Sequence, residues 1–178
     1  MKSELPFRSS PLVWAQPKAM SRAYELRSPD SPVGYLRFEK PCGSLATAEV
    51  ASRKWTFKRA GFLAPRVTVR SANPEAEIAV FRPHWSGGGT LHFADGHHAQ
   101  WRCTNFWGSQ WAFLGSDNHV VVGFRHHEGL FKASAQLQFE APSVALPDFP
   151  LLVALGWYLM ILAADDSAAV IAATVAAT

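Results

Sequence analysis

Over most of the chain, apolar and polar side chains alternate one by one in short runs that are separated by turn residues. The alternation extends from about residue 12 to residue 140. It is typical of half-buried antiparallel strands, because successive side chains of a strand point to opposite faces of the sheet. An amphipathic helix would instead repeat its apolar positions every three or four residues, and we find none in this region. The pattern predicts an all-β body.

Several turns set the order of the strands. In TLHFADGHHAQWRC the pair Asp95-Gly96 separates two apolar runs, and Asp-Gly readily adopts the positive φ angles of a tight hairpin turn. WAFLGSDNHVVVGF and RHHEGLFKASAQLQFE repeat this arrangement, RKWTFKRAGFLAPRVTVR reads as a further hairpin, and NPEAEIAVFRP adds a strand. We expect roughly ten to twelve antiparallel strands. The weaker ones are predicted at Leu12–Ala15, Arg22–Leu26, Val33–Glu39 and Leu45–Ala51.

A helix is predicted after the strands, in FPLLVALGWYLMILAADDSAAVIAATVAAT, residues 149–178. The segment is apolar on every helical face and contains two carboxylates and no cation. Asp148 suits the N-cap, and Pro150 falls in the first turn, where a helix tolerates proline. A helix that is apolar all round must be enclosed by lipid or by protein.

Enclosure by lipid would make the protein a C-terminally tail-anchored membrane protein that displays a cytoplasmic β domain. The uncharged run Phe149–Ala164 has 16 residues and would span about 24 Å, against about 30 Å of bilayer hydrocarbon. A longer span would bury Asp165 and Asp166, and the nearest upstream basic residue is as far away as Lys132. These features count against the anchor, which is kept as the alternative.

Enclosure by protein is the leading hypothesis. A closed sheet of ten or more strands leaves an interior that its own side chains do not fill, and a central helix fills it. We therefore predict a mainly β fold, a closed antiparallel β-barrel of about 10–12 strands around a hydrophobic C-terminal α-helix. The alanine-rich continuation after residue 162 would let the helix pass close to the strands, and Asp165 and Asp166 would lie at the far mouth, solvated or paired with arginine. The chain is expected to be one domain over residues 1–178, with residues 1–11 as candidates for disorder and 149–178 as the central helix.

This layout resembles the tubby C-terminal-like superfamily, which includes tubby proteins, phospholipid scramblases and LURP-one-related proteins. The resemblance covers nearly the whole chain and rests on the order of elements and on the segments WTFKRAGF, AEIAVF, FADG and FPLLVALGWYL. It implies the tubby-like barrel and binding of phosphoinositides. The chain has no obvious counterpart of a family calcium site or palmitoylated cysteine cluster, so scramblase activity is not implied.

One strongly basic stretch, Arg53–Arg70, holds six cations and no acidic residue. If its two strands pair as a hairpin, Trp55, Phe57, Val67 and Val69 point inward. The outer face would then present four candidate headgroup-binding residues, with Phe62 and Leu63 at the connecting tip for a shallow dip into the membrane. These candidates are Lys54, Lys58, Arg66 and Arg70. The alternative is a solvated positive face that protects a strand from aggregation.

Other candidate chemistry is weaker. The seven histidines invite a metal site, in which His97 or His98 would approach His126 or His127, but no HxH or HExxH pattern fixes such a geometry. The run Gly87–Gly89 lacks the context of a phosphate loop. Trp101, Trp107 and Trp111 either line an aromatic pocket or pack the core. No GxSxG motif, cysteine–histidine pair or paired carboxylates indicate catalysis, so we expect a binding module without catalytic residues, cofactor or metal. An enzyme or small-ligand carrier, with a pocket that the sequence does not locate, is kept as a third hypothesis.

Bulk composition agrees with a folded cytoplasmic domain. The chain is 48% hydrophobic with a formal charge of only +3, so binding to nucleic acid is not expected. Cys42 and Cys103 lie far apart, which favours a reducing compartment. The start MKSELPFRSSPLVWAQPKAM carries charge and proline where a signal peptide needs an apolar core. We expect a cytoplasmic protein, peripheral at a membrane if it binds anionic phospholipid, and the sequence indicates no particular protein partner.

Overall fold

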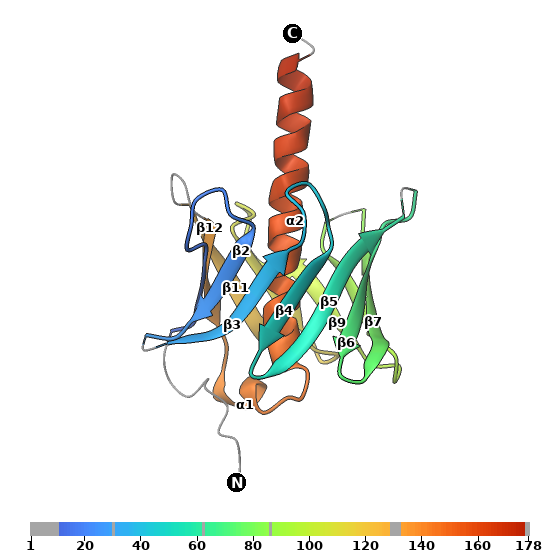
Figure 1. Cartoon of the computed structure of the whole chain (residues 1–178). Helices are drawn as coiled ribbons and strands as arrows, with labels where there is room; N and C mark the ends of the chain where they lie inside the picture. Colours follow the sequence, from blue (N-terminus) through green and yellow to red (C-terminus); the bar gives the residue numbers. More distant parts are fainter. Residues whose placement is uncertain (1–10, 30, 62, 86, 129–132, 177–178) are drawn as a thin grey trace.

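Twelve antiparallel strands form a closed barrel in the computed structural model (Figure 1). The structure describes residues 11–29, 31–61, 63–85, 87–128 and 133–176. Each strand pairs with its neighbours along the chain, and β1 closes the barrel by pairing with β12. The strands are β1 (Val13–Ala15), β2 (Ala23–Arg27), β3 (Pro32–Phe38), β4 (Ala46–Val50), β5 (Arg53–Ala60), β6 (Arg66–Ala72), β7 (Glu75–Pro83), β8 (Gly89–Phe93), β9 (His98–Cys103), β10 (Gln110–Leu114), β11 (Val120–Glu128) and β12 (Ala133–Gln138).

The predicted fold class is confirmed, and the four weaker strand predictions correspond to β1–β4 within one residue at each end. The two-residue period of the strands determines which side chains belong to the core. On β5 and β6 the side chains of Trp55, Phe57, Val67 and Val69 are buried, and the alternate side chains face outward. Closure leaves no free edge strand in the described sheet, because the first and last strands pair with each other.

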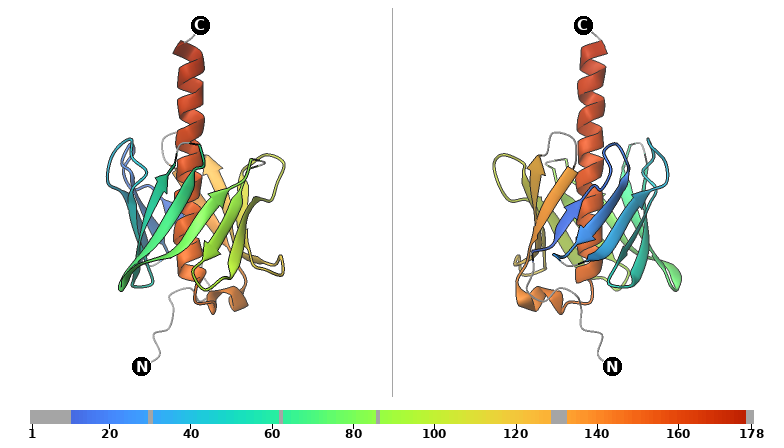
Figure 2. Two further views of the ribbon diagram at one scale, coloured as in Figure 1. Left: turned by 90° about the vertical axis from the view of Figure 1, so that its right-hand side faces the viewer. Right: turned by 60° about the vertical axis from the view of Figure 1, so that its left-hand side comes forward.

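Two helices follow the strands, α1 (Ala141–Val144) and α2 (Phe149–Ala176). The barrel axis is occupied by α2, which enters at one end of the barrel and leaves at the other (Figure 2). The carbonyl of Asp148 accepts the backbone hydrogen bond of Leu152 (2.9 Å) at the start of α2. The Asp148 carboxylate lies 2.9 Å from His97 Nε2, so it ties the helix to the β8–β9 turn.

Aromatic side chains pack α2 against the strands of the barrel wall. Trp157 stacks on Trp14 with their planes 4° apart, and Trp14 Nε1 donates to the carbonyl of Val153 at 3.2 Å. Tyr158 packs against Phe57 with ring centroids 5.2 Å apart, and its hydroxyl donates to the carbonyl of Ser44 at 2.6 Å. The wall and the helix therefore share one core.

One sequence expectation about α2 is wrong. The alanine-rich continuation does not run among the strands, since α2 is enclosed only from Phe149 to Leu162 and is exposed from Ala163 to Ala176. The barrel wall is only as tall as strands of three to nine residues allow, so a 28-residue helix outgrows it. The prediction of disorder for residues 1–11 falls almost entirely outside the described residues.

Candidate functional site

The exposed half of α2 projects from one end of the barrel as a free helix (Figure 1). Its 14 described residues, Ala163–Ala176, extend about 21 Å at 1.5 Å per residue. By length and composition α2 could cross a membrane, and only 17% of its most apolar 18-residue stretch is buried. A core helix that passes the same test would be mostly buried, so α2 combines a core segment with an exposed apolar segment.

The loops around the exit of α2 carry exposed apolar side chains. In an antiparallel meander alternate loops lie at the same end, and the exit end receives the loops after β1, β3, β5, β7, β9 and β11. Among the described residues, the large apolar side chains that are at least 65% exposed all lie in these loops or on the projecting helix. We call this set the apolar rim, and its members are Met20, Leu63, Trp85, Phe106, Trp107, Val170, Ile171 and Val175.

Charge also differs between the two ends of the barrel. The described loop residues at the exit end contain three cations, Lys18, Arg22 and Lys40, and a single acid, Glu39. Among their described residues, the loops at the opposite end contain four acids and no lysine or arginine. These acids are Asp95, Asp117, Glu140 and Asp148. The exit end is therefore both the apolar and the basic end of the molecule.

Two ion pairs mark the level at which α2 leaves the barrel. Arg22 Nη2 lies 2.7 Å from Asp165 Oδ2, and Arg59 Nη1 lies 2.6 Å from Asp166 Oδ2. The hydrogen bond from Arg59 to Asp166 raises the pKa of that guanidinium. The expectation that both carboxylates lie at the far mouth, paired with arginine, is confirmed, and their charges are neutralised by the wall.

The predicted basic hairpin forms as β5 and β6, and Lys54, Lys58, Arg66 and Arg70 are all exposed on its outer face. Two of them face acids, with Lys54 Nζ 3.6 Å from Glu49 and Arg70 Nη2 3.2 Å from Glu75. Among the described residues Lys58 and Arg66 form no ion pair, and both lie toward the exit end, where β5 ends and β6 begins. Leu63 at the hairpin tip is exposed, while Phe62 lies outside the described residues.

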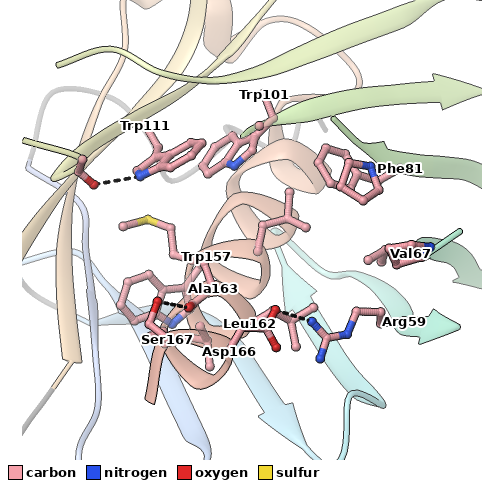
Figure 3. Close-up of a pocket in the computed structure, with 18 of the residues that line it drawn as sticks. Arg59, Val67, Phe81, Trp101, Trp111, Trp157, Leu162, Ala163, Asp166 and Ser167 are labelled. Atoms are coloured by element: carbon pink, nitrogen blue, oxygen red, sulfur yellow. Dashed lines mark hydrogen bonds and ion pairs between the residues drawn. The ribbon is translucent and has the colours of Figure 1, made fainter. Parts of the chain in front are cut away.

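A cavity of about 530 Å³ opens beside α2 at the exit end. The helix packs against β1–β5 and against β10 and β11. The cavity is bounded by residues of β5–β7, β9–β12 and α2 and by loop residues at the exit end. Figure 3 shows the indoles of Trp101 and Trp111 side by side above the helix, with Phe81 and Val67 further along the wall and Arg59 at the rim. Trp101 belongs to the core and Trp111 packs against it, and both also line the cavity, whereas Trp107 belongs to the apolar rim.

Histidines do not assemble into a metal site in the part of the chain that the structure describes. His97 and His98 lie where β9 begins, at the opposite end, and His126 lies toward the exit end of β11. No group of three metal-ligating side chains converges among the described residues. The approach of His97 or His98 to His126 that a metal site would need does not occur, because the two hairpins present these residues at opposite ends of the barrel.

Comparison of the chain with protein-family models, with curated proteins and with solved structures finds no match. The tubby-like resemblance therefore stays a prediction that rests on layout and on the quoted segments. Of the apolar rim, the sequence reasoning identified only Leu63, at the tip of the basic hairpin. The signal for the rest of the rim was present as large apolar residues inside predicted turns, such as Met20, Trp85 and Phe106-Trp107, where glycine and polar residues are usual.

Proposed function

We propose that this protein is a non-enzymatic lipid-binding module that docks on an anionic membrane with the exit end of its barrel. The observation that carries the proposal is the apolar rim, since every described large apolar side chain exposed by at least 65% lies at that one end. Exposed apolar groups gathered on one face mark an interaction surface. Tryptophan and other aromatic side chains favour the headgroup level of a bilayer, which suits loop tips that carry Trp85, Phe106 and Trp107.

The projecting half of α2 supplies the inserted element. Beyond Ser167 it has no charged side chain through Thr178, and Asp165 and Asp166 remain at the barrel mouth, each bound to an arginine. Insertion of α2 therefore leaves both carboxylates at the membrane surface. The cost of burying them, which counted against an anchor in the sequence, does not arise in this arrangement.

Anionic headgroups are bound by cations around the same end. Lys58 and Arg66 carry no ion pair among the described residues, and Lys18 and Lys40 lie in exit-end loops. Each lysine or arginine near an anionic surface contributes about 1 kcal/mol. Lys54 and Arg70, which face Glu49 and Glu75, contribute less. This arrangement joins headgroup recognition with C-terminal anchoring, on the cytoplasmic face of a membrane, and it agrees with the phosphoinositide binding that the tubby-like resemblance implies.

Vesicle sedimentation tests the proposal with the full chain. We expect co-sedimentation with vesicles that contain phosphatidylserine and weaker binding to phosphatidylcholine alone. Replacing Trp85, Phe106 and Trp107 together by serine should abolish binding, while Leu146→Ser, at an exposed apolar position of the opposite end, should not. Equal binding to neutral and anionic vesicles would contradict headgroup recognition. Unaltered binding of the triple variant would contradict docking by the exit end.

A charge-matched comparison locates the headgroup contacts. Lys58→Gln with Arg66→Gln and Lys54→Gln with Arg70→Gln each remove two positive charges from the same hairpin. Because only the first pair lies toward the exit end without acidic partners, it should weaken binding to anionic vesicles more strongly. Equal effects of the two double variants would point to bulk charge instead of this site.

A further inference from the structure

The cavity beside α2 has the form of a ligand site. Its volume of about 530 Å³ falls within the range of roughly 300–1,000 Å³ that is usual for small-molecule pockets. The cavity lies where α2 stands away from the wall, since the principal contacts of the helix are with β1–β5, β10 and β11. It opens at the end of the barrel that bears the apolar rim, because Ala163, Ala164 and Ser167 of the emerging helix line it.

The lining of the cavity is amphipathic. Its inner wall consists of large apolar side chains, in which Trp101 and Trp111 stack with ring centroids 5.5 Å apart. Phe81, Leu159 and Met160 continue this wall. The charged and polar members belong to the rim, where Arg66 is exposed and forms no ion pair among the described residues, and where Arg59 binds Asp166. An occupant with an apolar body and an anionic head matches this division.

One polar atom of the lining residues is buried without a partner among the described residues. Trp157 lines the cavity and is 0% exposed, and its Nε1 has no hydrogen-bond partner among the described residues. Buried indole N–H groups almost always find an acceptor, since an unpaired buried donor is costly. By contrast, Trp111 Nε1 in the same wall donates to the carbonyl of Gly108 at 2.9 Å. The indole of Trp157 is therefore a polar point in an inner wall that is otherwise apolar.

We infer that this cavity binds one molecule of a single-chain anionic amphiphile, with the acyl chain against the Trp101–Trp111 wall and the anionic head at Arg66. A free fatty acid and a lysophospholipid share this chemistry. The inference goes beyond docking of the barrel on a membrane, because the site lies inside the barrel wall and its geometry does not depend on a bilayer. The molecule would enter between α2 and the β5–β6 tip, beside Pro65 and Ala164.

Tryptophan quenching in vesicle-free solution tests this inference separately from membrane docking. The protein carries Trp85→Phe and Trp107→Phe, which remove the two exposed indoles. The probes are dibromostearate, a brominated lysophosphatidic acid and a brominated long-chain alcohol, each used below its critical micelle concentration. We expect saturable quenching by at least one anionic probe. The uncharged alcohol should bind at least about tenfold more weakly than that probe. Absence of quenching by both anionic probes, or equal binding of the alcohol, would overturn the inference, and the better anionic probe identifies the class of ligand.

Two helix variants control for access to the cavity. Ala164→Phe places a ring at the mouth, whereas Ala168→Phe adds the same ring one turn further along the exposed helix, at a position that does not line the cavity. Both positions are exposed, so both variants should unfold at the temperature of the parent protein. Ala164→Phe should lower the affinity for the anionic probe by about tenfold, and Ala168→Phe should leave that affinity unchanged. Equal affinities of the two variants would contradict entry at this mouth, whatever the vesicle assays show.

Discussion

Arg59 on β5 and Asp166 on α2 are joined by a hydrogen bond of 2.6 Å between Nη1 and Oδ2, across 107 positions of the chain. With the pair Arg22–Asp165, this contact divides α2 into two helices of different character. Below it the side chains are core, and above it they are exposed and mostly apolar. The two ion pairs therefore define the boundary between the part of α2 that stabilises the barrel and the part that we assign to the membrane.

The pair Arg59–Asp166 should contribute little to stability. Both side chains are more than a third exposed, and ion pairs in that environment contribute about 0–1 kcal/mol. We expect a double-mutant cycle of Arg59→Gln and Asp166→Asn, followed by urea unfolding, to give a coupling free energy below about 1 kcal/mol. A coupling above about 3 kcal/mol would mean that the pair is desolvated and that α2 leaves the barrel at a different level.

Gly156 should not tolerate a side chain, although it lies in the middle of a helix. A Cβ added there would lie 2.3 Å from Cζ of Phe124 on β11, whose ring is buried. Gly156→Ala gains helix propensity but overpacks the contact, and we expect a net loss of about 1–2 kcal/mol in the free energy of unfolding. Phe124→Leu in the same chain should restore part of the loss. A stabilised Gly156→Ala variant would show that α2 and β11 are not in close contact.

Removal of the projecting helix should separate folding from binding. A chain that ends at Ser167 keeps the buried segment Phe149–Leu162 and both ion pairs, so it should retain its near-UV circular dichroism and cooperative unfolding. The same chain should lose most of its affinity for vesicles. A chain that ends before Asp148 lacks the core helix and should fail to fold, which distinguishes this barrel from a β domain that is merely tethered to an anchor.

Tyr158 should make stability depend on alkaline pH. Burial raises the pKa of its phenol above the usual value of 10.0, so the neutral form is favoured in the folded state. Stability from this group is fully present below about pH 10 and is lost as the pH rises toward the folded-state pKa. The free energy of unfolding of Tyr158→Phe should be about 1 kcal/mol lower than that of the parent protein at pH 7, because the hydrogen bond to Ser44 disappears.

Between pH 9 and pH 12 the variant should lose less stability than the parent protein, as measured by urea unfolding at each pH. Burial also raises the pKa of Tyr24, so part of the alkaline sensitivity remains in both proteins. Parallel pH profiles for the parent protein and Tyr158→Phe would contradict burial of the Tyr158 hydroxyl.

Alternation and turn chemistry were sufficient to predict the barrel, because period two and Asp-Gly turns are local properties of the chain. The central helix was predicted because an apolar helix and a one-sided sheet each need the other. The exit level of α2 was not predictable in the same way, since it depends on the height of the wall relative to the helix. An alanine-rich helix is compatible with both a barrel interior and an exposed position, and in the structure this segment lies outside the barrel.

The candidate site was predicted only in part. The β5–β6 hairpin and the outward direction of Lys58 and Arg66 follow from period two alone. The acids opposite Lys54 and Arg70 come from β4 and from the first residue of β7, and strand register across a closed barrel decides such pairs. The apolar rim gathers loop residues that are distant in sequence, and only the topology places Met20 and Trp107 at the same end.

The depth of α2 in a bilayer is the most direct test of docking by the exit end. In a chain with Cys42→Ser and Cys103→Ser, an environment-sensitive fluorophore is attached at Ile171→Cys on the projecting helix or at Asn118→Cys in a loop of the opposite end. We predict that vesicles containing phosphatidylserine shift the emission at position 171 to the blue and that lipids brominated in the acyl chain quench it, with neither effect at position 118. Vesicle-bound protein whose fluorophore at 171 stays in water, or is no more protected than the one at 118, would contradict the account.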